Sequence, residues 1–154
     1  MGLFDKFVKT PEIKDLIYKP LSDFEAWIGI LYACMSSDGE VSDVEIDSLS
    51  RMIVLKQKFS GIDISPLYNS VSEAKLKIGG IGLVEACSEF VNENDKDTLF
   101  SMAVEIVLAD GILNKDEEKV IELIADRMKI DMELVEKIIQ VMLIRNRGNV
   151  LIVD

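Results

Sequence analysis

Two short segments of the chain carry the same pattern of carboxylates around an Asp-Gly pair. Residues 38–45 and 110–117 both read Asp-Gly-x-apolar-(Ser/Asn)-x-x-Glu, at an offset of 72 residues. Carboxylate oxygens are ligands that favour hard cations such as Ca²⁺, Mg²⁺ or Mn²⁺ over Zn²⁺. If internal symmetry brings the two loops together, we expect an acidic patch that holds such a cation with several waters. The carboxylates concerned are Asp38, Glu40, Asp43, Glu45, Asp110, Asp116, Glu117 and Glu118.

The spacing is not that of an EF-hand. With Gly39 at loop position 6, Val41 falls at position 8 and Glu45 at position 12, as an EF-hand requires. Positions 1 and 3 would then be Cys34 and Ser36, which belong to the preceding helix. The second copy has apolar residues at both positions. Half of the oxygen ligands are therefore missing, and an EF-hand is excluded.

The same residues also have a folding role. Asp-Gly ends one helix, and Ser42 or Asn114 caps the next, where Glu45 or Glu117 completes a capping box. Val41 and Leu113 would then fill the core. Cation binding and helix capping therefore remain two open interpretations of the repeat.

Acid–base catalysis needs a carboxyl group in an apolar cleft. These polar segments predict solvated carboxylates instead, so we expect no enzymatic activity.

The sequence around the two loops predicts helices that position them, in an all-α single domain over residues 1–154. Apolar residues at helical spacing surround each copy, so that two helix–loop–helix units are expected at about 22–58 and 97–128. A short helix in 1–19 and helices between and after the units bring the total to about seven or eight. Gly79, Gly80 and Gly82 predict a turn between helices, because no Gly-Lys-(Ser/Thr) of a phosphate-binding loop follows.

Capping signals mark several helix starts. Ser22 and Glu25 predict a capping box at the start of a central helix. Ser65 followed by Pro66 predicts a capped start, and Asp131 predicts a cap for the last helix.

Composition excludes several classes of protein. The 154 residues include no histidine, which rules out histidine-dependent nucleophiles and histidine-ligated zinc or haem. With 28 acidic and 17 basic residues, the net charge of −11 disfavours nucleic-acid binding.

Cys34 and Cys87 lie on apolar helix faces, which indicates buried, reduced thiols. Without an apolar run that could span a bilayer, we expect a soluble, cytoplasmic protein.

Both ends of the chain carry apolar segments. Residues 1–9 could form an amphipathic helix that docks on the domain, or one that touches a membrane or a partner. The tail 146–154 contains four consecutive apolar residues, 150–153. It either packs on the domain or meets another chain. Nothing in the composition predicts the oligomeric state.

The duplicated Asp-Gly unit and the start Met1-Gly2-Leu3-Phe4-Asp5-Lys6 resemble the TerB-like tellurite-resistance (stress-response) family. The resemblance implies an all-helical, internally duplicated fold without known enzymatic activity. It further implies partners among membrane-associated stress-resistance proteins, with the chain at the inner face of the membrane. The acidic positions linked to metal binding in the family would be Asp38, Glu45, Asp110 and Glu117.

Two functional hypotheses follow. In the first, a non-enzymatic stress protein binds a divalent cation through its Asp-Gly loops and acts through partner proteins. In the second, the chain is a helical protein-interaction module in which the acidic residues only cap helices.

Overall fold

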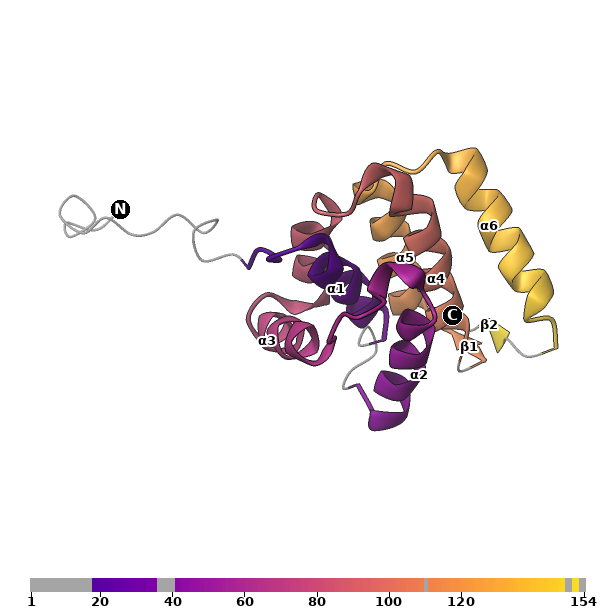
Figure 1. Ribbon diagram of the computed structural model, residues 1–154. Helices are drawn as coiled ribbons and strands as arrows, with labels where there is room; N and C mark the ends of the chain where they lie inside the picture. The colour runs from indigo at the N-terminus through magenta and orange to yellow at the C-terminus, as the bar shows by residue number, and fades with distance from the viewer. Residues whose placement is uncertain (1–17, 36–40, 110, 149–150, 153–154) are drawn as a thin grey trace, which may run out of the picture.

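Helices α1 (Asp23–Met35) and α4 (Lys96–Leu108), the first helix of each repeat, form the centre of the fold (Figure 1). The computed structural model describes residues 18–35, 41–109, 111–148 and the backbone of 151–152. Every residue of α1 from Glu25 to Leu31 is buried, as expected of a central helix. The buried apolar side chains of both repeats belong to one hydrophobic core.

The other helices surround this centre. Within the described residues they are α2 (Asp43–Val54), α3 (Ser65–Ser88), α5 (Lys115–Arg127) and α6 (Met132–Arg145), with 3₁₀ turns η3 (Gln57–Phe59) and η4 (Glu93–Asp95). Helix α1 packs against α3 and α4, and α6 packs against α4 at the edge of the molecule (Figure 1). The predicted all-α class is confirmed. The predicted repeat units correspond to α1 with α2, and to α4 with α5.

The described part of the chain contains six α-helices rather than the seven or eight predicted. One reason is α3, which runs through the predicted glycine turn. It is sharply broken at Gly79, where φ is 75° and ψ is 175°, a conformation that glycine adopts without steric cost. The predicted break is therefore present, but helical turns resume directly after it. The expected helix of 1–19 lies outside the described residues, except for its last two positions.

The predicted caps are only partly confirmed. Ser65 is the first residue of α3 rather than its cap, and its N–H donates to Asp63 Oδ1 at 3.1 Å. Asp131 holds the cap position of α6, but its side chain makes no capping hydrogen bond. At α1, Ser22 Oγ accepts from Glu25 N–H at 3.2 Å, which is half of the predicted box.

The Glu25 carboxylate does not complete that box. It is 2% exposed and accepts hydrogen bonds from the Tyr18 hydroxyl and from Leu21 N–H, the latter at 3.3 Å. A buried carboxylate needs such donors to offset its lost hydration. Glu25 therefore fastens the segment before α1 to the core.

The tail adds a pairing that the helical pattern did not predict. Strand β2 (Leu151–Ile152) pairs in parallel with β1 (Ile112–Leu113), with Ile112 opposite Leu151. Of the two alternatives for the tail, its backbone thus packs on the domain. No helix in the described ranges is long and apolar enough to cross a membrane.

Candidate functional site

The structure describes two of the four predicted metal ligands. Glu45 lies in the first turn of α2 and Glu117 in the first turn of α5. Asp38 and Asp110 lie outside the described residues.

Both glutamates form the predicted capping boxes. Ser42 Oγ accepts from Glu45 N–H at 3.2 Å, and Glu45 Oε1 accepts from Ser42 N–H at 3.3 Å. Asn114 Oδ1 accepts from Glu117 N–H at 2.9 Å, and Glu117 Oε1 accepts from Asn114 N–H at 3.2 Å. Each box satisfies two backbone donors that the helix itself leaves unpaired. The predicted capping role of Ser42, Glu45, Asn114 and Glu117 is thus confirmed.

The two glutamates also line the same cleft. It has a volume of about 370 Å³ and lies between α1, α2, α4 and α5. Cys34 and Ile106, which are likewise equivalent at the 72-residue offset, line it as well. The duplication therefore builds one composite cleft from matching positions of both repeats.

The polar groups of the cleft differ in burial. Glu117 is 4% exposed, whereas Glu45 is partly exposed. The expectation that the repeat carboxylates are solvated is wrong for Glu117, because α5 turns this residue toward the core. Burial raises the pKa of the Cys34 thiol, and the nearby charge of Glu117 raises it further. Cys34 is therefore held as a neutral thiol.

A third carboxylate, Glu105 of α4, lines the cleft and was missed by the sequence analysis. The available signal was an acidic residue inside the apolar run of 102–108. It has no acidic equivalent in the first repeat, where Ala33 stands at the matching position. Repeat symmetry alone therefore could not find it.

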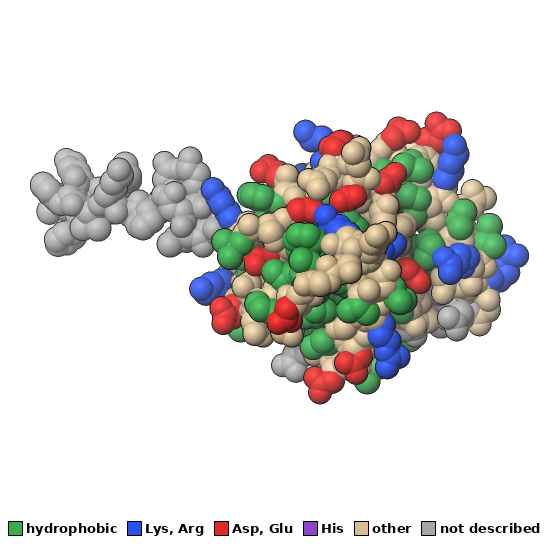
Figure 2. All heavy atoms as spheres, in the orientation of Figure 1, with side chains coloured by type: hydrophobic (Ala, Val, Ile, Leu, Met, Phe, Trp, Pro, Cys, Tyr) green, Lys and Arg blue, Asp and Glu red, His purple; other side chains and the backbone are tan. Residues whose placement is uncertain are grey.

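The described residues do not make a complete metal site by themselves. Among them, no group of three or more His, Cys, Asp or Glu side chains lies close enough to hold an ion. Apart from the three glutamates and Ser48, the cleft is lined by apolar side chains and Cys34. On the face shown in Figure 2, acidic side chains are spread out rather than gathered in one patch.

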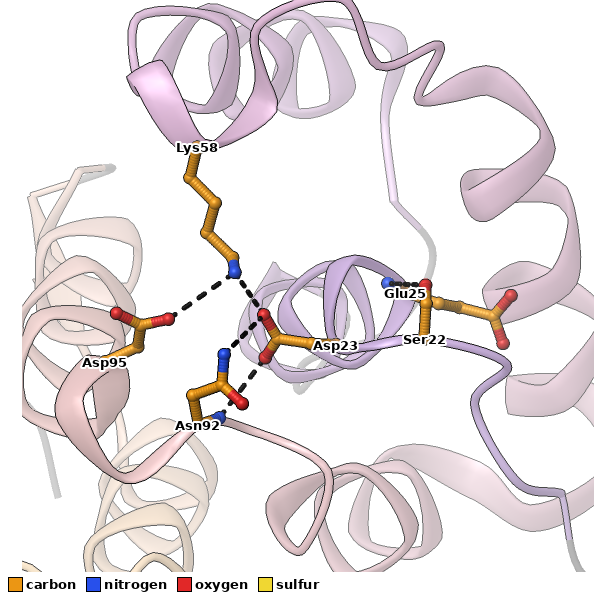
Figure 3. A network of polar contacts seen from close by, with 6 residues as sticks. All are labelled: Ser22, Asp23, Glu25, Lys58, Asn92 and Asp95. Carbon is orange, nitrogen blue, oxygen red and sulfur yellow. Dashed lines mark hydrogen bonds and ion pairs between the residues drawn. The ribbon is translucent and has the colours of Figure 1, made fainter.

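A separate polar cluster surrounds Lys58 (Figure 3). Its ammonium group pairs with Asp23 and lies 3.5 Å from Asp95 Oδ2. Asp23 Oδ1 also accepts from Asn92 N–H at 3.3 Å. The ammonium lies 4.8 Å from the centre of the Phe24 ring, a cation–π distance. The cluster therefore ties η3 and η4 to the start of α1.

The electrostatics of this cluster favour the charged ammonium. Burial lowers the pKa of Lys58, but the hydrogen bond and charge of Asp23, together with Asp95, outweigh burial and raise it. Because Lys58 and Asp23 are 35 residues apart, no local pattern predicts the pair. Each of these polar groups has a partner within the cluster, so we assign the cluster a structural role.

Comparison with known families identifies the fold. Residues 24–140 match the model of the family described as tellurite resistance protein TerB. The chain belongs to the TerB family. The match runs from α1 into α6 and includes every described residue that lines the cleft, so the TerB-like resemblance expected from the Asp-Gly repeats is confirmed. Comparisons with curated proteins and with solved structures gave no match.

Proposed function

We propose that this TerB-family protein is a non-enzymatic stress protein that binds a divalent cation at the cleft between its two repeats. The observation that carries the proposal is that Glu45 and Glu117, equivalent residues of the two repeats, line one cleft. Asp38 and Asp110 of the two Asp-Gly segments would supply further oxygen ligands. Such ligands suit Ca²⁺, Mg²⁺ or Mn²⁺.

The action of the bound cation would be to alter contacts with partner proteins. The family description supports a role in tellurite resistance. The partners would be stress-resistance proteins associated with a membrane, which the cytoplasmic chain meets at the inner face. The family resemblance supports this choice of partners.

A second candidate is a helical interaction module without a cation. It is favoured by the two capping boxes, in which Glu45 and Glu117 already have partners that account for their presence. In that case the negative charge at the cleft would serve folding and solubility only.

A glutamine exchange separates the two candidates. Glutamine completes a capping box as glutamate does but carries no charge for a cation. In Glu45→Gln/Glu117→Gln, we therefore expect the metal-free fold to persist and cation binding to weaken. Asp43→Asn/Asp116→Asn is the matched control, because it removes the same charge from the same helix starts. Neither of its residues lines the cleft.

The measurement is an amide NMR titration of each protein with Ca²⁺, Mg²⁺ and Mn²⁺, with Asp38→Asn/Asp110→Asn as a further variant. We expect saturable shifts around the cleft in the wild type and in the control. We expect these shifts to be lost in the glutamine variant and in the Asp38/Asp110 variant. Diffuse shifts that never saturate, or shifts that all variants share, would reject the cation site and leave the interaction module.

A further inference from the structure

Helix α6 carries far more apolar residues than the domain buries. Of its 14 residues only Val135 and Met142 are buried, whereas Ile138 and Ile139 are partly buried. A helix that is apolar on most of its circumference is normally covered on most of it. The apolar residues left exposed are Met132, Leu134, Val141, Leu143 and Ile144.

One edge of α6 has the spacing of a coiled-coil seam. Leu134, Ile138 and Val141 follow at intervals of four and three residues, and Leu134 and Val141 are 37% and 54% exposed. The same intervals continue to Asp131 before and Arg145 after. Alternating intervals of three and four residues keep side chains on one line facing a second helix. We call these five residues the α6 seam.

The opposite edge of α6 faces the rest of the domain. Ile139 and Leu143 line a groove of about 250 Å³ together with residues of α4, α5 and β1. Strand β2 pairs with β1, so the returning tail lies on that side. Leu134, Val141 and Arg145 of the α6 seam are exposed, and α6 itself lies at the edge of the molecule (Figure 1). Figure 2 shows hydrophobic and basic side chains side by side on the surface over α6.

Charges at the two ends of the seam are opposite. Asp131 precedes the first turn of α6 and Arg145 closes the last. Neither side chain forms an ion pair with another residue that the structure describes. In an antiparallel pair of identical α6 helices centred near Ile138, Asp131 of each helix would lie opposite Arg145 of the other. Leu134 would lie opposite Val141 in the same way.

We propose that the α6 seam pairs antiparallel with the α6 seam of a second copy of this chain. An isologous two-fold interface of this kind forms the Asp131–Arg145 pair twice and covers the exposed Leu134 and Val141 of both helices. The C-terminal half of the seam, from Val141 onward, lies beyond the residues that match the TerB family. The pairing is independent of the cation site, because no seam residue lines the cleft.

The test is sedimentation velocity of the full chain over a range of concentrations. We expect a reversible dimer, and we expect Val141→Lys to raise its dissociation constant at least about tenfold. Gln140→Lys is the matched control. It adds the same charge one residue earlier, on an exposed position that points away from the seam, and should change the constant by less than about twofold. Circular dichroism of each variant checks that α6 remains folded.

A charge swap tests the antiparallel register. Asp131→Lys and Arg145→Glu should each weaken the dimer, because each places like charges opposite one another twice. The double variant Asp131→Lys/Arg145→Glu should restore it, since opposite charges face again. A wild-type chain that is monomeric throughout would overturn the proposal. The proposal would also be overturned if Val141→Lys left the dissociation constant of the dimer unchanged, or if the double charge-swap variant failed to dimerise. A monomeric chain whose seam binds a different protein would overturn it as well.

Discussion

The Cys87 thiol shows how burial of a single residue makes stability depend on pH. It is buried, and burial, with a smaller effect of the Glu25 charge, raises its pKa from 9.0 to about 12. Above pH 9 the unfolded chain releases this proton while the folded chain keeps it. The unfolded state then binds fewer protons, so the free energy of unfolding must fall as pH rises.

We expect this loss to approach about 1.4 kcal/mol per pH unit from Cys87 between its unfolded and folded pKa values. Urea unfolding at pH values from about 8 to about 10, below most tyrosine and lysine titrations, measures it. Cys87→Ala removes the group and should show a shallower slope than the wild type. Equal slopes in the two proteins would show that the thiol is not held neutral by the fold. Cys34, whose pKa is also raised, should contribute to the slope that remains.

Among the elements, the contact of α1 with α3 depends on a glycine. A Cβ added at Gly29 would lie 2.4 Å from Cys87 Sγ, closer than real contacts allow. We expect Gly29→Ala to destabilise the fold by about 1–3 kcal/mol, the usual cost of overpacking a core. Chemical denaturation of the purified variant measures the change.

Two further variants test whether the cost arises at this contact. Gly80→Ala makes the same substitution where the nearest atom would be 3.9 Å away, and it should cost far less. Cys87→Ala should relieve the contact, so that Gly29→Ala costs less in that background. Additive free energies in the double variant would contradict a direct clash between the two helices.

At the scale of the whole molecule, the net charge of −11 opposes the compact state. We therefore expect the melting temperature to rise with monovalent salt, which screens this repulsion. Divalent cations at matched ionic strength should raise it further only if they bind a specific site. That additional rise should vanish in Glu45→Gln/Glu117→Gln and persist in Asp43→Asn/Asp116→Asn. If NaCl and MgCl₂, CaCl₂ or MnCl₂ act equally at matched ionic strength, screening alone accounts for the effect.

Features set by neighbouring residues could be predicted from the sequence alone. The boxes of Ser42 with Glu45 and of Asn114 with Glu117 are such features, as is the break at Gly79. Each depends on groups within one helical turn or on the φ of one residue, so the residue types suffice. The two repeats and the all-α class follow from the same local periodicity.

The tertiary structure determined the side-chain contacts that local sequence patterns do not predict. Glu25 has the spacing of a capping box, yet its buried carboxylate accepts hydrogen bonds from the Tyr18 hydroxyl and Leu21 N–H instead. The composite cleft likewise needs both repeats folded together, which adds Glu105 to the two predicted glutamates. Local patterns select helices and their ends. Packing determines which side chains of distant helices meet, and the candidate site exists only because packing brings Glu45, Glu105 and Glu117 to one cleft.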